Sequence, residues 1–371
     1  MVSPASRIYA RTKITDAYGR PFNNLRIAVT AECNYKCIFC HIEGEPIGGP
    51  ARIGTLPPRM TPEDYGVLAE AAWLLGADSF KITGGEPLVR RDIVEIVRNI
   101  SQSAPGSDIS MTTNGYLLGK YASRLAEAGL RRVNISIHSL NRDVYEFITG
   151  VDGLDAALAG LRAAREAGLK VKINMVVLRG VNEDEIWSLA RLAAEYNAIL
   201  QLIELHPVGQ GARFFRKYYY PLSIVEDELR ARGATVHRRS LHNRPIYQLG
   251  PVRIEVVRPY ANPIFCAGCT RIRVGPFGDL SPCLNWRGRR PNVLAAIRGK
   301  KTREEKVLAA ARTLLEANML RRPFFLAGVH DNGDWHAASS NVKGRMRLPK
   351  RVDYQRVLGE LERLLLGRAY R

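Results

Sequence analysis

The residues best suited to chemistry in this chain are its six cysteines, which fall in two compact groups of three. The first group is Cys33-Asn-Tyr-Lys-Cys37-Ile-Phe-Cys40, a C-x3-C-x2-C pattern. Three thiolates on one loop can bind three irons of a cubane cluster and leave its fourth iron open to a small molecule. Zinc is the alternative, with His41 as the fourth ligand, although zinc sites more often use paired C-x2-C units.

The second group is Cys266, Cys269 and Cys283, in a C-x2-C-x13-C pattern. Three ligands again allow a cluster with an open iron. The alternative is a small zinc or Fe–S site that only cross-links this part of the chain. Arg271 and Arg273 follow closely, and alternation along a short strand places both side chains on the same side. Two guanidinium groups beside an open iron suit an anionic ligand such as a polyphosphate.

Both groups need a scaffold, and the sequence predicts repeated βα units. Buried strands are expected in six apolar, β-branched runs: 25–30, 79–83, 108–113, 132–138, 170–177 and 199–205. Helical periodicity lies between them, at 62–75, 92–101, 117–128, 154–167 and 183–197. This alternation predicts an open doubly wound sheet or a complete or partial barrel, with the chemistry at the carboxyl ends of the strands. Residues after about 210 read as a smaller α+β segment that carries the second cysteine group.

Composition and charge narrow the possible partners. The chain has 371 residues, of which 46% are hydrophobic and 25% charged, which excludes a disordered chain. No apolar run approaches the roughly 20 residues that cross a bilayer, and the N-terminal residues lack a secretory signal, so we expect a cytoplasmic protein without a membrane partner. Of the formal net charge of +19, residues 246–371 contribute +14. This bias favours an anionic partner, such as nucleotide phosphates, nucleic acid or an acidic protein.

The first cysteine pattern, placed directly after the first strand, resembles that of the radical S-adenosylmethionine (SAM) superfamily. A second feature supports this resemblance, because Thr83-Gly84-Gly85-Glu86-Pro87 closes the second strand and matches the GGEP motif of that superfamily. The two glycines allow the backbone to approach a ligand closely, and Glu86 is suited to meet an ammonium group. The resemblance implies a [4Fe–4S] cluster on the first cysteine group that binds SAM and cleaves it reductively.

From about Arg20 to Arg298 the chain is similar to the GTP 3′,8-cyclase family of molybdenum-cofactor (molybdopterin) biosynthesis. The matching stretches are 24–30, 81–83, 112–115, 134–137, 171–174 and the cysteine–arginine segment that ends at Cys283. The resemblance implies an incomplete (βα)6 TIM-like barrel with a C-terminal α+β segment that carries a second [4Fe–4S] cluster. It also implies the reaction, in which a 5′-deoxyadenosyl radical takes the 3′ hydrogen of GTP and the ribose radical attacks C8 of guanine.

The same resemblance assigns residues to each ligand. The SAM pocket is implied to contain Phe39, Gly85, Glu86, Ser136 and His206. GTP is implied to lie against Arg26, Lys81, Thr112, Lys172, Arg271 and Arg273, of which Arg26, Arg271 and Arg273 are expected to be catalytic. The open iron of the cluster on Cys266, Cys269 and Cys283 is implied to bind the guanine end of GTP.

We expect an organisation into four parts: an N-terminal extension (1–20), a radical SAM barrel (21–212), a domain for the auxiliary cluster and GTP (213–340), and a basic tail with a helix (341–371). The implied partners, besides GTP, are an electron-donor protein, a cyclic pyranopterin monophosphate synthase downstream, and a second copy of the chain in a homodimer. Nucleic acid is not expected to be a partner.

The chain departs from the family pattern in two places. Gln201 stands where family members usually have Arg, and the chain ends Leu366-Gly-Arg-Ala-Tyr-Arg371 where they commonly carry Gly-Gly on a tail that enters the active site. Two alternatives therefore stay open: a paralogous radical SAM enzyme that acts on a peptide or on RNA, and a non-catalytic Fe–S or zinc protein that binds nucleic acid.

Overall fold

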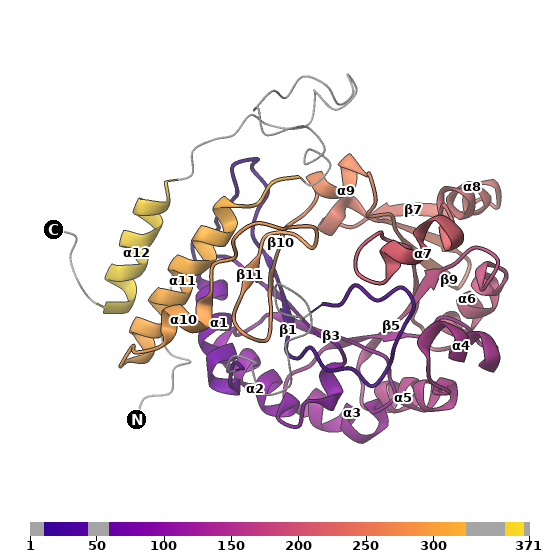
Figure 1. Ribbon diagram of the computed structural model, residues 1–371, viewed down its shortest axis with the longest axis horizontal. Helices are drawn as coiled ribbons and strands as arrows, with labels where there is room; N and C mark the ends of the chain where they lie inside the picture. The colour runs from indigo at the N-terminus through magenta and orange to yellow at the C-terminus, as the bar shows by residue number, and fades with distance from the viewer. Residues whose placement is uncertain (1–10, 44–58, 324–352, 367–371) are drawn as a thin grey trace, which may run out of the picture.

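The computed structural model describes residues 11–43, 59–323 and 353–366, and one curved sheet organises these residues (Figure 1). Six parallel strands follow one another through its centre: β1 (Asn24–Ala28), β2 (Ser79–Thr83), β3 (Asp108–Thr113), β4 (Arg132–Ser136), β5 (Lys170–Val177) and β6 (Ile199–Glu204). The helices between them cover the outside of the sheet: α1 (Pro62–Leu74), α2 (Ile93–Ser103), α3 (Leu118–Glu127), α4 (Arg142–Thr149), α5 (Leu154–Glu166) and α6 (Ile186–Glu195). The chain therefore forms the expected incomplete (βα)6 barrel.

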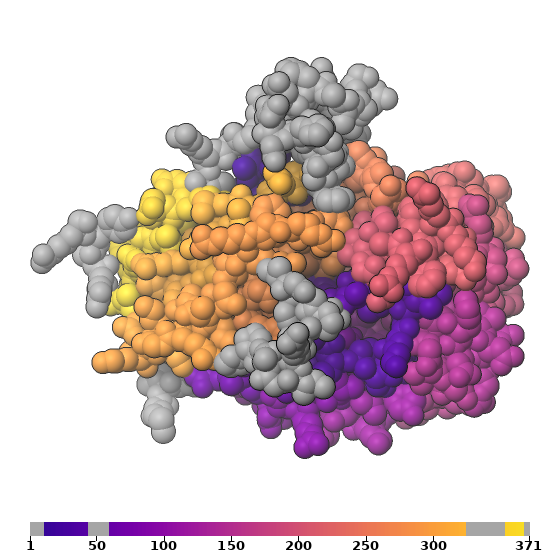
Figure 2. Space-filling view, viewed as in Figure 1, coloured from indigo at the N-terminus to yellow at the C-terminus, as the bar shows by residue number. Residues whose placement is uncertain are grey.

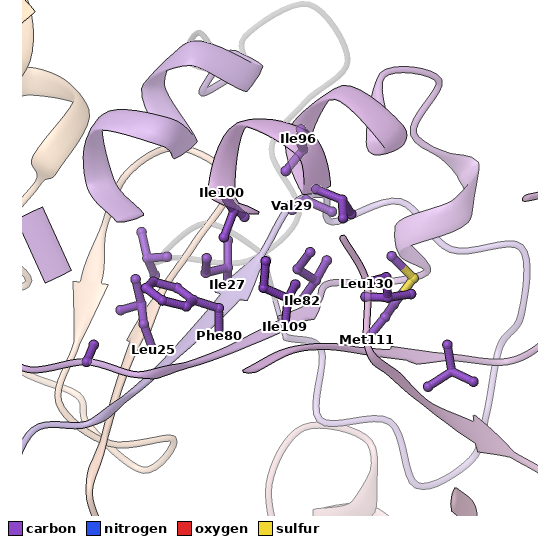
Figure 3. Packing of buried hydrophobic residues seen from close by; sticks show 14 of the residues in the cluster. Leu25, Ile27, Val29, Phe80, Ile82, Ile96, Ile100, Ile109, Met111 and Leu130 are labelled. Atoms are coloured by element: carbon purple, nitrogen blue, oxygen red, sulfur yellow. The ribbon is translucent and has the colours of Figure 1, made fainter. Parts of the chain in front are cut away.

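The central strands have an apolar outer face and a polar inner face. Figure 3 shows the outer layer, in which Leu25, Ile27, Phe80, Ile82, Ile109 and Met111 lie with Ile96 and Ile100 of α2. Because successive side chains of a strand point to opposite faces, the residues between them, such as Arg26 and Lys81, face the interior of the barrel. The hydrophobic core thus holds the strands, and the interior is left free for a ligand.

Strand pairing brings the inner polar residues to neighbouring positions. Three rows of paired residues result: Arg273–Arg26–Lys81, Thr112–Asn134–Lys172 and Asn174–Gln201–Glu255. Residues that are far apart in the sequence therefore meet inside the barrel.

The C-terminal part extends both edges of this same sheet. On one side β9 (Val252–Val257) pairs in parallel with β6 and is followed outward by β8 (Pro245–Leu249) and β7 (Thr235–Arg238). On the other side β10 (Arg271–Val274) pairs in parallel with β1 and is followed by β11 (Leu280–Ser281). The smaller α+β segment is thus divided between the two edges, and the expected division into domains stays a prediction.

The C-terminal helices lie on two sides of the molecule. On one side are α7 (Gly211–Tyr218), α8 (Ser223–Ala231) and α9 (Pro263–Ala267). On the other, α10 (Val293–Ile297), α11 (Arg303–Met319) and α12 (Tyr354–Leu366) stack beside α1 (Figure 1). Residues 1–10 of the extension expected at 1–20, and most of the tail expected at 341–371, lie outside the described residues. None of the helices within the described ranges is both long enough and apolar enough to span a membrane.

Residues at the ends of the helices show how far short sequence signals predict the local structure. Thr61 caps α1, since its side chain accepts a hydrogen bond from the Asp64 backbone N–H. Asn182, which precedes the expected helix at 183–197, forms no such cap and donates its side-chain amide to the carbonyls of His138 and Val176. The sequence does not predict three short elements, the helices α4 and α7 and the strand β7. Short segments contain too few repeats of a hydrophobic pattern to be recognised.

Candidate active site

One cavity of about 380 Å³ inside the barrel gathers the candidate residues. It is lined by both cysteine groups and by every residue assigned above to SAM or to GTP. Figure 2 shows the indigo segment that carries the first cysteine group between the orange C-terminal elements and the pink region around α7. The structure therefore brings all the predicted site residues to a single site, while their individual roles stay predictions.

The Gly84-Gly85 pair positions the loop of the first cysteine group. The Gly85 N–H donates to the Thr30 carbonyl and the Glu86 N–H to the Glu32 carbonyl, each at 2.8 Å. A Cβ on Gly84 would lie 2.5 Å from the Thr30 oxygen, and one on Gly85 would lie 2.2 Å from the Glu32 oxygen. The glycines are thus required for close approach of the backbone to the segment before Cys33, and their expected approach to a ligand stays a prediction.

The chemistry of the cysteines fits iron–sulfur clusters. Burial raises the pKa of the Cys33 thiol to about 11 and raises that of Cys37 further, so a cationic metal centre is needed to hold their thiolates. Within the described ranges, no three His, Cys, Asp or Glu side chains converge as the ligands of a single metal ion would. A cluster does not require such convergence, because the three thiolates bind three different irons.

Several residues implied to bind SAM surround the first cysteine group. Phe39 packs edge-to-face on His138, with ring centroids 4.7 Å apart. His206 follows β6, and its Nε2 lies 3.0 Å from Oδ1 of Asn285. The Nδ1 of His206 is buried without a hydrogen-bond partner among the described residues, so a polar group of a ligand would satisfy it.

Glu86 is a buried carboxylate at the carboxyl end of β2. It accepts hydrogen bonds from the Thr113 hydroxyl at 2.7 Å, the Asn114 N–H at 2.7 Å and the Leu88 N–H at 3.0 Å. Burial raises the pKa of the Glu86 carboxyl to about 7 despite these bonds. The carboxylate both ties β3 to the end of β2 and lines the cavity beside the first cysteine group.

This raised pKa predicts a pH-dependent affinity for SAM. Glu86 is neutral below its pKa and ionised above it, and only the ionised form attracts the SAM ammonium group. We expect SAM affinity, measured by anaerobic equilibrium dialysis, to rise about tenfold between about pH 6 and pH 8. The Glu86→Gln variant should show a flat profile, and an equally flat profile in the unmodified protein would contradict the assignment of Glu86.

A buried ionic network holds the second cysteine group. Arg321 is fully buried, and its guanidinium donates to the Cys269 carbonyl at 2.6 Å, while Arg20 donates to the Cys266 carbonyl at 3.0 Å. Asp16 lies between them, 2.7 Å from Arg20 and 3.6 Å from Arg321. Burial alone would raise the pKa of the Cys269 thiol, but the two guanidinium groups lower it and so favour the thiolate that binds iron.

Arg321→Met is therefore expected to destabilise the protein by about 3 kcal/mol, because it leaves Asp16 and the Cys269 carbonyl with fewer partners. Denaturant unfolding of the anaerobic protein measures this loss. Arg303→Met, which breaks the exposed pair with Glu70 on α1, is the matched control and should change stability little. Equal stability of both variants would show that the network is not required.

A basic group lies next to the second cysteine group, on β1, β2 and β10. Glu43 binds Arg26, whose Nη2 lies 2.6 Å from Oε2, and also pairs with Arg273. Arg271 donates to Oδ1 of Asn24 at 2.5 Å, and Lys81 donates to Oδ1 of Asn134 at 2.7 Å. Burial and then the neighbouring cations lower the pKa of Lys81 well below its ordinary value, which an anionic ligand would reverse.

The cavity as a whole is strongly positive. Among the described residues, ten Arg and Lys side chains line it against the carboxylates of Glu43 and Glu86. Only three further carboxylates within the described ranges, those of Asp16, Asp108 and Glu255, pair with these cations from behind the lining. Buried cations without counterions are costly, so this imbalance indicates a ligand with several negative charges.

Some lining residues are not identified by sequence reasoning. Arg239 and Arg244 reach the cavity from the chain between β7 and β8, and Asn285 reaches it from the segment after Cys283. Gln201, where the chain departs from the family pattern, lies 3.4 Å from a guanidinium nitrogen of Arg244. The excess of positive charge after residue 245 is the only sequence signal nearby, and it does not single out these residues.

Comparison with known proteins agrees with this geometry. The sequence model of the Radical SAM superfamily matches residues 27–193, and that of Molybdenum Cofactor Synthesis C matches residues 198–323. In fold, the chain is similar to Streptococcus suis SuiB bound to S-adenosylmethionine, with a TM-score of 0.57 and 19% identity. That match covers 75% of this chain and 65% of SuiB. The fold and the site define a radical SAM enzyme.

Curated relatives give the family within that class. A probable GTP 3′,8-cyclase of Aeropyrum pernix is 46% identical over 93% of this chain and 96% of its own length. Another, of Thermococcus kodakarensis, is 43% identical over 84% of this chain and 99% of its own length. The chain belongs to the GTP 3′,8-cyclase family.

Proposed function

We propose that this protein is the GTP 3′,8-cyclase of molybdenum- or tungsten-cofactor biosynthesis, which converts GTP to (8S)-3′,8-cyclo-7,8-dihydroguanosine 5′-triphosphate. The observation that carries the proposal is the single cavity lined by two groups of three cysteines and by ten Arg and Lys side chains. A polyanionic nucleotide held between two clusters matches this combination. The names of the curated relatives support the same reaction.

The cysteines provide the sites of two [4Fe–4S] clusters. Cys33, Cys37 and Cys40 would hold the first cluster, and Cys266, Cys269 and Cys283 the second. When bound, the first cluster and SAM supply a carbon radical that removes a hydrogen atom from the substrate. Gly85, Glu86, Phe39, Ser136 and His206 would hold SAM, with Glu86 on the ammonium group.

The basic residues fix the substrate between these two sites. Arg26, Arg271 and Arg273 would hold phosphate oxygens through charged hydrogen bonds, and Lys81 and Lys172 add fixed positive charge. Thr112 lines the same wall. Such positioning contributes to the rate because it holds the ribose carbon and the purine ring of one molecule in reacting orientation.

The proposal is tested anaerobically on protein reconstituted with iron and sulfide. SAM and a strong reductant are added, and 5′-deoxyadenosine is followed with and without GTP. We expect cleavage that depends on GTP and a cyclised product with the mass of GTP. Cleavage that is indifferent to GTP would point to a paralogue with another substrate, and no cleavage despite about eight irons per chain would point to a non-catalytic binding protein.

Further partners and the location belong to the same proposal. An electron-donor protein has to supply the reducing electron, and a cyclic pyranopterin monophosphate synthase would consume the product. A homodimer and a cytoplasmic location stay predictions, of which the second is supported by the reducing conditions that open iron sites require.

A further inference from the structure

A second group of cations lies on another wall of the cavity, around the carboxylate of Glu255. Glu255 lies on β9 and is fully buried. It pairs with Lys172 of β5, with Arg244 at 3.1 Å and with Arg239 at 3.4 Å. The three cations line the cavity, and Glu255 is not among the lining residues. The carboxylate therefore lies behind the cations, which face the ligand.

The charges in this group do not balance. Burial alone would raise the pKa of Glu255, but Arg244, Lys172 and Arg239 lower it to about 2, so the carboxylate is ionised at neutral pH. One negative charge then faces three positive ones. Burial also lowers the pKa of Lys172 to about 8, although the neighbouring Glu255 acts to raise it.

The segment that carries Arg239 and Arg244 is fixed in place before any ligand binds. The Arg239 N–H donates to the Arg244 carbonyl at 2.9 Å across a short turn, η4 (Leu241–Asn243). Within this turn His242 has a φ of 63°, an uncommon conformation for a residue other than glycine. It is held by a 2.6 Å hydrogen bond from the His242 N–H to the Gly268 carbonyl and by stacking on Phe265, with centroids 4.0 Å apart. Backbone held in this way at a cavity is typical of preorganised binding sites.

The cations around Glu255 and the basic group on β1, β2 and β10 face the same cavity. Arg244 comes from the edge of the sheet beyond β6, whereas Arg26 and Arg271 lie on β1 and β10 at its other side. Arg244 nonetheless lines the same cavity as Arg26 and Arg271. A negative charge between the groups would be stabilised by both, and only an extended polyanion can contact both at once.

We propose that Arg239, Arg244 and Lys172 form a second phosphate subsite, and that this subsite selects nucleoside triphosphates over nucleosides with fewer phosphates. The inference rests on the proposed function and adds two residues, Arg239 and Arg244, that determine substrate specificity. Each further phosphate adds negative charge that needs a cationic partner, and this group supplies two unbalanced positive charges.

The test compares the affinities of anaerobically reconstituted protein for GTP and GMP by isothermal titration calorimetry. Arg244→Met should weaken GTP binding about 30-fold and GMP binding less than about threefold, so that the ratio of the two affinities falls. Arg239→Met should lower the ratio in the same direction, to a smaller extent because Arg239 is more exposed and its contact with Glu255 is longer. Arg253→Met is the matched control, since Arg253 lies on β9 but binds the Asn197 carbonyl outside the cavity.

Equal losses of affinity for GTP and GMP, or no loss for either, would overturn the inference, because the cations would then be structural. Arg244→Met leaves Glu255 with two cationic partners, and if this variant fails to fold, the ratio of affinities measured for Arg239→Met decides between the two roles. Failure of the proposed function is distinguishable, since the unmodified protein would then cleave SAM independently of GTP.

Discussion

Replacing Arg271 or Arg273 by alanine is expected to abolish GTP turnover, with a loss of two to three orders of magnitude or about 3–4 kcal/mol. Both arginines lie on β10, with buried Ile272 between them, and both face the cavity beside the second cysteine group. Their removal takes fixed positive charge from the site where the substrate phosphates are proposed to bind. The measurement is the rate of cyclised product formed per chain under anaerobic conditions.

Two further measurements separate a substrate role from a structural one. Iron content should stay at about eight per chain in both variants, because the cysteines are unchanged. Arg290→Ala removes a guanidinium from the same C-terminal segment, where it pairs with Asp279 at 3.1 Å outside the cavity, and should leave turnover unchanged. Full turnover in the Arg271 or Arg273 variant would exclude these residues from phosphate binding.

Replacing one cysteine of each group is expected to separate SAM cleavage from its dependence on GTP. Cys37→Ser should remove the first cluster and with it all SAM cleavage. Cys269→Ser should instead lower iron from about eight to about four per chain, keep some SAM cleavage and lose its dependence on GTP. Iron analysis and 5′-deoxyadenosine formation measure the two effects.

Each cysteine variant serves as the control for the other. Both remove one partly buried thiol from the same cavity, so general damage to the fold should affect them alike. If Cys269→Ser keeps the full iron content, the second group does not hold a cluster. If Cys37→Ser still cleaves SAM, the first group is not the SAM site.

Local patterns in the sequence predict the scaffold and the main chemistry. The spacing of Cys33, Cys37 and Cys40 and the Gly84-Gly85-Glu86 turn identify the class, because both features lie within single loops. The six central strands are also predicted, with shifts of one or two residues at their ends, since each is a short buried run. The alternation of Arg271 and Arg273 predicts that they share a face, and both do line the cavity.

The remaining parts of the site depend on pairings between distant segments. No sequence pattern predicts that β9 pairs with β6 or that β10 pairs with β1. The ion pair between Glu255 and Lys172 therefore cannot be predicted from the sequence. Glu43 is likewise an ordinary loop residue until β10 brings Arg273 to it. Gln201 stands where family members usually have Arg, but Arg244 lies beside it and supplies a guanidinium to the same wall of the cavity.

The order of the strands also bears on how the protein is made. During synthesis β1 and the first cysteine loop emerge early, but β10, the neighbour of β1, follows only after more than 240 further residues. Contacts between such distant segments form slowly, and the nascent chain exposes unpaired strand edges until they do. The first cluster can therefore be inserted while the barrel is still open on that side, whereas the nucleotide site is completed last. A ribosome-bound chain that stops before β10 should acquire iron and yet have no binding site for GTP.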